Sequence, residues 1–227
     1  KGAQMLGFRT LPEALVNLAR LLENHSVRAY VHFYFDKIDA VCHSYGPEAP
    51  QTGAEIESFL LLMEHFFGRL FDPGKRVLFL MTADHGASEV DPKTTIYLNT
   101  DPRFAGLDRF FRRNARGELL VPAGSPRDMF LYIRSELLDE AQAFLSARLH
   151  GRAEVVKVSE LIDQGYFGPE VSPEFQQRVG NLVILPYLGE SVWWFVRHRF
   201  EQRYYGQHGG LTPEEMDIAL FTCELNT

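Results

Sequence analysis

The sequence predicts an α/β fold in which a mostly parallel central sheet carries helices on both faces. Helical and strand patterns alternate in its N-terminal part, an order typical of crossover connections between parallel strands. The run Val77–Met81 is apolar at every position, as is usual for strands buried on both faces of a parallel sheet. A length of 227 residues suits one compact domain, so we expect residues 1–227 to form a single α/β domain.

The first helix has a clearly marked start. Leucines recur at helical spacing from Leu11 to Asn24, Thr10 stands at the N-cap position, and Pro12 lies in the first turn. Glu13 comes three residues after Thr10, so the hydroxyl and the carboxylate can each accept a backbone N–H as a capping box. We therefore expect a helix over residues 11–24.

The other elements follow from apolar periodicity and composition. Residues 106–126 mix Arg, Gly, Asn and Pro and are expected to form a surface loop. Amphipathic patterns predict helices over 54–70, ended by the turn Asp72-Pro73-Gly74, and over 137–149. β-Branched, aromatic or continuously apolar segments predict strands over 27–35, 77–81, 129–133, 153–158, 181–185 and 217–222.

The bulk composition argues against two classes of partner. The formal net charge is -7 at pH 7, whereas nucleic acids and anionic membranes attract basic surfaces. No apolar stretch approaches the ~20 residues of a transmembrane helix. Cys42 and Cys223 are the only cysteines, which favours a reducing, cytoplasmic compartment. The sequence starts at Lys1 without an initiator Met, so an upstream signal segment is not excluded and the localisation stays open.

The first segment with candidate chemistry follows the strand expected over 27–35. If the chain turns helical there, Asp39 and His43 lie four residues apart on one face, where a carboxylate and an imidazole can bind one cation. Asp36 returns to the same face and is an alternative ligand. The structural alternative is a solvated Asp with a His at a helix end.

Two further segments carry the same residue types. Asp84, His85 and Gly86 follow the apolar strand, and ligands collect where the strands of an open α/β sheet end. A carboxylate and an imidazole are suitable ligands for zinc. His208 lies in a Gly-rich loop, just before a helix start at Thr212-Pro213 in which Glu215 can complete a capping box. A structural turn and an ordinary loop His are the alternatives for these segments.

The three segments 39–47, 82–86 and 208–216 together resemble, in the family's order, the alkaline phosphatase superfamily, most closely its type I phosphodiesterase and nucleotide pyrophosphatase branch. The resemblance extends over most of the chain. It implies an alkaline-phosphatase-like fold with two divalent metal ions, zinc in that family, at the carboxyl ends of the sheet. Carried over, it assigns Asp39, His43 and His208 to one metal and Asp84 and His85 to part of the other, and it favours Asp39 over Asp36.

The resemblance implies a metal-dependent phosphoric ester hydrolase that acts on a small-molecule phosphoester. The family's Thr or Ser nucleophile and a further Asp belong to an N-terminal segment that nothing before Asp39 resembles, since Thr10 is explained as a cap and Ser26 lacks the context. We therefore interpret residues 1–227 as the C-terminal part of a larger catalytic domain, inactive without the nucleophile.

Other interpretations remain open. Phosphomonoesterases, sulfatases and phosphomutases share the metal pattern, and a non-catalytic metal-binding or interaction domain would retain the same ligands without a nucleophile. The basic residues Arg112, Arg113 and Arg116 are either a phosphate-binding patch or a solvated loop face.

Overall fold

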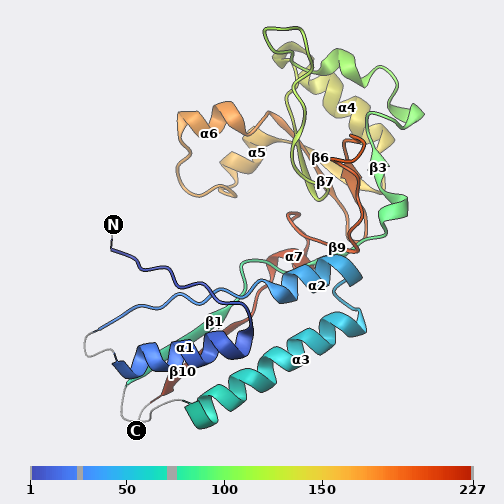
Figure 1. The fold of residues 1–227 in the computed structure, drawn as a ribbon. Helices are drawn as coiled ribbons and strands as arrows, with labels where there is room; N and C mark the ends of the chain where they lie inside the picture. The colour runs from blue at the N-terminus through green and yellow to red at the C-terminus, as the bar shows by residue number, and fades with distance from the viewer. Residues whose placement is uncertain (1, 25–27, 71–75, 226–227) are drawn as a thin grey trace. The chain divides into compact units, whose positions relative to one another are not determined.

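The computed structural model describes residues 2–24, 28–70 and 76–225 (Figure 1). The chain divides into two compact units, one made of the residues up to Ala83 together with those from Ala219 onward, and one made of Asp84–Ile218. The expectation of a single domain stays a prediction. Within the described ranges, no helix combines the length and the apolar character needed to cross a membrane.

Among its described residues, the first unit contains three helices, a π-helical turn and a pair of strands. Its core consists of one face of the first helix packed against the end of the third and the π-helical turn, with Leu11, Leu15, Ala19, Met63 and Phe66 buried. The elements are α1 (Leu11–Asn24), α2 (Lys37–Tyr45), α3 (Pro50–His65), the turn η1 (Phe66–Leu70), β1 (Val77–Thr82) and β10 (Leu220–Leu225).

Helix α1 has the bounds that the sequence predicts, and half of its expected capping box is present. The amide of Glu13 donates to the Thr10 hydroxyl oxygen at 3.4 Å. The Glu13 carboxylate accepts the N–H of Arg9 at 3.0 Å instead of that of Thr10. The expected helix over 54–70 is confirmed as α3 followed by η1, beginning four residues earlier at Pro50 because proline is well suited to a first helical position. The turn Asp72-Pro73-Gly74 lies outside the described residues.

Strand β1 lies where the apolar run predicts a strand, but its environment differs from the prediction. It pairs antiparallel with β10, from Val77 opposite Leu225 to Thr82 opposite Leu220. Leu78 and Leu80 are 62% and 56% exposed, so in the described structure the strand is not buried on both faces. A continuous apolar run shows that burial would be favourable, but it does not show that a neighbouring layer is present or in which direction a partner runs.

The strand expected over 27–35 is not formed, since residues 28–36 have no regular secondary structure. The two-residue periodicity is nevertheless retained, because Phe33 and Phe35 pack against the core while Tyr34 is exposed. Phe33 stacks on Phe8 at 5.5 Å and Phe35 on Phe59 at 5.2 Å between ring centroids. Aromatic contacts, rather than a hydrogen-bonded ladder, therefore hold residues 28–36. Val27 lies outside the described residues.

The second unit is built around a four-stranded antiparallel sheet in the order β4-β5-β7-β6. Its strands are β4 (Ala123–Ser125), β5 (Asp128–Leu131), β6 (Ala153–Lys157) and β7 (Leu182–Pro186). Two short pairs accompany it, an antiparallel one of β2 (Ser88–Glu89) with β9 (Gly206–Gln207) and a parallel one of β3 (Ile96–Tyr97) with β8 (Val192–Trp193). The helices of this unit are α4 (Leu138–Arg148), α5 (Val158–Asp163), α6 (Pro173–Arg178) and α7 (Pro213–Met216), with 3₁₀ turns at Pro92–Thr94, Pro102–Phe104, Leu107–Phe110 and Ser135–Leu137.

The positions of these elements agree with the sequence better than their pairing does. The strands expected over 129–133, 153–158 and 181–185 and the helix over 137–149 are present within a few residues, whereas the last strand begins at Leu220 rather than Asp217. A mostly parallel sheet is not observed, because β3–β8 is the single parallel ladder among the described strands. The connection between β4 and β5 spans two residues, which is long enough only for an antiparallel hairpin.

The expectation that residues 106–126 form a surface loop is wrong for the first part of the segment. Leu107, Phe110 and Phe111 are 3%, 0% and 1% exposed and belong to the main core of this unit. Phe111 forms a β-bridge with Ile133, which fixes the segment against the continuation of β5. Arg109, Arg112 and Arg113, which lie next to these apolar residues in the sequence, are exposed, so a high average polarity hid the buried residues.

Candidate functional site

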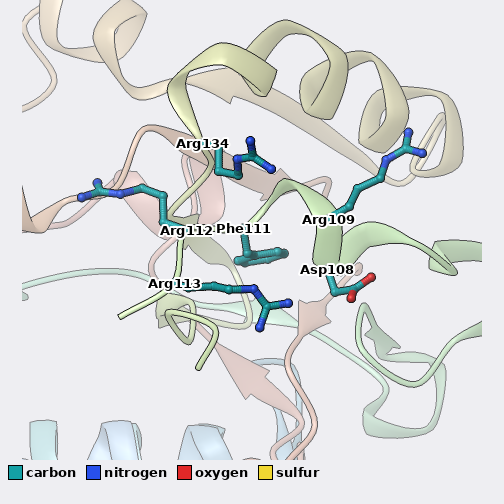
Figure 2. Close-up of a pocket in the computed structure, with 6 residues that line it drawn as sticks. All are labelled: Asp108, Arg109, Phe111, Arg112, Arg113 and Arg134. Atoms are coloured by element: carbon teal, nitrogen blue, oxygen red, sulfur yellow. The ribbon is translucent and has the colours of Figure 1, made fainter. Parts of the chain in front are cut away.

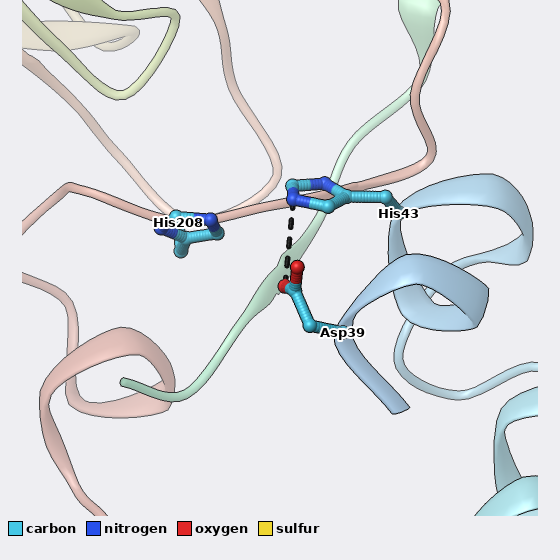
Figure 3. A group of neighbouring side chains, drawn as sticks. All are labelled: Asp39, His43 and His208. Carbon is cyan, nitrogen blue, oxygen red and sulfur yellow. Dashed lines mark ion pairs between the residues drawn. The ribbon is translucent and has the colours of Figure 1, made fainter. Parts of the chain in front are cut away.

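In the first unit, helix α2 presents Asp39 and His43 on one face, as the four-residue spacing predicts. His43 Nε2 lies 3.4 Å from Asp39 Oδ1, and the two side chains are 22% and 42% exposed (Figure 3). The helix ends at Gly46, whose positive φ of 100° suits glycine and whose N–H donates to the Cys42 carbonyl at 2.7 Å. This local sequence therefore ends the helix just beyond His43.

The Asp39–His43 spacing fits a tetrahedral ion. Two ligands bound ~2.0–2.1 Å from such an ion lie about 3.3–3.4 Å apart, which agrees with the observed separation of 3.4 Å. The alternative ligand Asp36 is differently placed, because its Oδ1 lies 3.0 Å from Lys37 Nζ. The hydrogen bond from Lys37 lowers the pKa of Asp36. Asp36 is thus paired with Lys37, whereas Asp39 lies beside His43.

Cys42 lies between these residues in sequence but is buried. Burial, and then the negative charge of Asp39, raise the pKa of the Cys42 thiol to about 11. The group therefore stays a neutral thiol at pH 7.

In the second unit, the chain after β1 carries Asp84 and His85. His85 Nε2 lies 3.7 Å from Asp84 Oδ1. His85 Nδ1 lies 2.9 Å from the Gly86 carbonyl oxygen, and because a carbonyl oxygen only accepts hydrogen bonds, this nitrogen carries the proton. In the neutral ring, Nε2 then keeps its lone pair, which is the form that binds metals.

The second unit also brings together two segments that are far apart in the sequence. The rings of His85 and His208 are stacked, with centroids 3.6 Å apart and planes inclined by 13°. His208, also drawn in Figure 3, is followed by Gly209 with a φ of 113°. A Cβ at Gly209 would lie 2.7 Å from the Ser125 hydroxyl oxygen, so this position requires glycine for both conformation and space.

Three residues beneath the His208 loop carry polar contacts that the sequence did not indicate. The Ser125 hydroxyl donates to the His208 carbonyl at 3.2 Å. Asp128 Oδ1 accepts the Ser125 amide at 2.7 Å and also contacts the Ser125 hydroxyl. Burial raises the pKa of Asp128, although the bonds from Ser125 oppose the shift. Arg127, between them, is fully buried. Nothing in the local sequence distinguishes this charged residue from a surface arginine.

The capping box expected at Thr212 is not formed. Thr212 is the N-cap residue of α7, but its side chain makes no capping hydrogen bond. Glu215 is instead buried at 2% exposure and paired with Arg127. Burial alone would raise the pKa of Glu215, but the hydrogen bonds and positive charge of Arg127 outweigh this effect, and the pKa lies below its usual value.

The segment that contains Arg109, Arg112 and Arg113 borders a cavity of about 680 Å³ (Figure 2). This segment is separate in the sequence from those that carry the candidate metal-binding histidines. Two of its arginines are ion-paired, Arg109 with Glu140 at 2.7 Å and Arg134 with Glu136 at 2.6 Å. Figure 2 shows the guanidinium groups of Arg109 and Arg112 pointing away from the central Phe111 ring. The side chains that border it are those of Asp108, Arg109, Phe111, Arg112, Arg113 and Arg134.

Arg116 is therefore not among the residues that line this cavity. Arg113 is engaged as well, since its Nη1 donates to the Gly117 carbonyl at 2.7 Å. Arg112, Arg113 and Arg116 do not together line this cavity, and the alternative of a solvated loop face describes them better than a phosphate-binding patch.

Comparison with known proteins gives a family and a set of structural relatives. A model of the type I phosphodiesterase / nucleotide pyrophosphatase family matches residues 8–211. Murine ectonucleotide pyrophosphatase/phosphodiesterase 5 has a TM-score of 0.64 at 17% identity, covering 95% of this chain and 53% of that one. An inactive form of the murine protein in complex with AMP gives 0.61 at 18% identity, with the same coverage of 95% and 53%. No curated protein sequence matches the chain.

A bacterial enzyme shares the fold as well. Phosphonoacetate hydrolase from Sinorhizobium meliloti 1021, in complex with phosphonoformate, has a TM-score of 0.54 at 19% identity, covering 81% of this chain and 43% of that one. At these identities the relatives establish a common fold, and the chain spans about half of the length of the murine protein, 53%. The family match extends over most of the chain, from residue 8 to residue 211, so the chain belongs to the type I phosphodiesterase / nucleotide pyrophosphatase family of the alkaline phosphatase superfamily.

Proposed function

We propose that this chain is part of a metal-dependent phosphoric ester hydrolase that acts on a small-molecule phosphoester. Asp39, His43 and His208 are assigned to one divalent metal ion, and Asp84 and His85 to part of a second. Carboxylate oxygen and imidazole nitrogen together form a donor set that suits zinc. The observation that carries the proposal is the 3.4 Å separation of Asp39 Oδ1 and His43 Nε2.

The geometry inside the second unit supports the other half of the assignment. The hydrogen bond between His85 Nδ1 and the Gly86 carbonyl selects the tautomer with an available Nε2. The stacked ring of His208 lies beside it, at 3.6 Å between centroids. Two imidazoles from separate segments thus lie together at the surface of the unit, next to the Asp84 carboxylate.

The chemistry follows from the charges that such a site gathers. Bound divalent ions supply positive charge that stabilises the negative charge developing on the phosphoryl oxygens. The role of this chain's residues would be to hold that charge in place, through the imidazole nitrogens of the histidines and the carboxylate oxygens of Asp39 and Asp84. The solved relatives were captured with AMP and with phosphonoformate, which supports a small phosphorylated or phosphonate substrate.

The nucleophile is proposed to come from outside residues 1–227. In this chain the hydroxyl group of Thr10 lies at the start of α1, where it accepts a hydrogen bond from the Glu13 amide at 3.4 Å. We therefore expect hydrolysis from the full-length protein and none from this chain alone. A full-length protein that binds zinc and hydrolyses no phosphomonoester, phosphodiester or phosphonate would favour the non-catalytic alternative.

The decisive experiment measures zinc on the purified chain by element-resolved mass spectrometry after zinc loading and buffer exchange, with dissociation constants from calorimetry. We expect stoichiometric zinc on the wild type, loss of the ion in Asp39→Ala and in His208→Ala, and retention in Asp36→Ala. The last variant is a matched control, because it removes a carboxylate from the same helix start. Zinc retained at wild-type affinity in both of the first two variants would overturn the assignment.

A further inference from the structure

We propose that Glu215 is a positioning residue that fixes His85 and His208 relative to each other, with Arg127 as its buried counter-ion. The inference rests on the proposed function, since it concerns how the second unit prepares two of the assigned ligands. Glu215 itself is not assigned to the metal. Its contacts with three separate parts of the unit carry the argument.

The first contact is a buried, two-point ion pair. Arg127 Nε donates to Glu215 Oε1 at 2.8 Å, and Arg127 Nη2 donates to Oε2 at 2.7 Å. The side chains are 0% and 1% exposed. Arg127 Nη1 donates to the carbonyl of Tyr187 at 2.8 Å and also to that of Glu190. A desolvated pair of this kind is tolerated only where the remaining donors and acceptors are also satisfied, as they are here.

The second contact reaches the segment that carries His208. The Glu215 carboxylate accepts the Gly210 amide at 3.0 Å and the Thr212 hydroxyl at 2.9 Å. A Cβ at Gly210 would lie 2.5 Å from Glu215 Oε2, so the loop backbone rests directly on the carboxylate. The position of the loop two residues after His208 is therefore set by Glu215.

The third contact reaches the segment that carries His85. The carbonyl of Glu215 accepts the Gly86 amide at 2.8 Å. A Cβ at Gly86 would lie 2.1 Å from the Glu214 carbonyl oxygen, so the two backbones approach as closely as glycine allows. The Gly86 carbonyl in turn accepts the proton of His85 Nδ1 at 2.9 Å. One residue thus holds the backbone next to each of the stacked rings.

These contacts also explain why an acidic residue so close to the histidines is not a ligand. The carboxylate of Glu215 receives four donors, two from Arg127, one from Gly210 and one from Thr212. These bonds use the lone pairs that an ion would need. The role left to Glu215 is to hold the segments that carry the ligands. Replacing a residue that holds a metal ligand typically changes metal affinity about 10–100-fold.

The test compares Glu215→Gln with Glu214→Gln in the metal-free and zinc-loaded chain. Glutamine keeps the size and one acceptor oxygen but removes the charge opposite Arg127, and Glu214 is an exposed neighbour on the same short helix. The first readout is the ring-proton chemical shifts of His85 and His208 by NMR without metal, because stacked rings shield each other. The second is the zinc dissociation constant, measured at a temperature where each variant is fully folded. Thr212→Val, which removes one of the four donors, is a milder variant should Glu215→Gln fail to fold.

We expect Glu215→Gln to lose the mutual shielding of the two rings and to weaken zinc binding about 10–100-fold, and Glu214→Gln to change neither. If Glu215→Gln lowers thermal stability but leaves ring shifts and zinc affinity unchanged, the residue is structural only and the inference is wrong. A wild type that binds no zinc would refute the proposed function instead, and the ring shifts would still decide whether Glu215 positions the histidines.

Discussion

Gly86 approaches Glu214 so closely that a Cβ at residue 86 would lie 2.1 Å from the Glu214 carbonyl oxygen. The approach accompanies the hydrogen bond of 2.8 Å from the Gly86 amide to the carbonyl of Glu215. Backbone atoms, unlike a flexible side chain, cannot rotate away from such an overlap. The glycine that follows Asp84 and His85 is therefore required by packing within the second unit.

Replacing Gly86 by Ala is expected to destabilise the second unit by about 1–3 kcal/mol, the usual cost of forcing extra atoms into a packed site. Urea unfolding monitored by tryptophan fluorescence reports on this unit, because Trp193 and Trp194 both pack against its core. Gly53→Ala is the control. Gly53 lies in α3 of the first unit, with no atom near the added Cβ, so Gly53→Ala should leave the tryptophan-monitored transition of the second unit unchanged. Equal effects of the two substitutions would show that the close approach at Gly86 is not rigid.

The buried pair of Arg127 and Glu215 leads to a second prediction. Arg127→Met leaves a carboxylate buried without its counter-ion and is expected to cost about 3–5 kcal/mol of unfolding free energy. Arg127→Met combined with Glu215→Leu is expected to recover part of this loss, since no unpaired charge then remains. Arg109→Met removes an arginine from an exposed pair with Glu140 and should cost far less. A double variant no more stable than Arg127→Met would contradict the electrostatic explanation.

The thiol of Cys42 is expected to be slow to alkylate. Its pKa of about 11, raised by burial and by Asp39, leaves roughly 0.1% thiolate at pH 8, and the thiolate is the reactive form. At any pH below this pKa, the alkylation rate of Cys42 should rise about tenfold for each unit by which the pH is increased. Asp39→Asn should increase it by removing a negative charge.

Peptide mass spectrometry after iodoacetamide treatment would follow both cysteines. Cys223, which is more accessible on β10, provides the internal comparison. Modification of Cys42 as fast as Cys223 in the folded protein would show that Cys42 is not protected.

Features set by neighbouring residues were predictable from the sequence. Helix α1 ends and begins where Thr10, Pro12 and the leucine spacing indicate. The shared face of Asp39 and His43 follows from helix geometry alone once α2 forms. These relationships depend on residues within one or two turns, which is the range over which a sequence pattern carries information.

Features set by distant partners were not predictable. The apolar run at β1 suited a buried parallel strand, yet its antiparallel partner β10 lies at the far end of the chain. The sequence Thr212-Pro213-Glu214-Glu215 suited a capping box, yet the Glu215 carboxylate is instead hydrogen-bonded to Arg127. A charged bidentate pair away from water is stronger than an exposed capping bond, and no local pattern indicates which arginine will be buried.

The pairing of β1 with β10 has a consequence for the order of folding. Thr82 lies opposite Leu220, and the whole of residues 84–218 intervenes between them in the chain. Bringing the ends of so long a segment together costs chain entropy, and this cost is smaller once the segment itself has become compact. We therefore infer that the antiparallel β-sheet of the second unit assembles early, through contacts closer in sequence, and that the β1–β10 ladder closes last. The strand that leads to Asp84 and His85 would then reach its final state only after the partner histidine's loop has already folded.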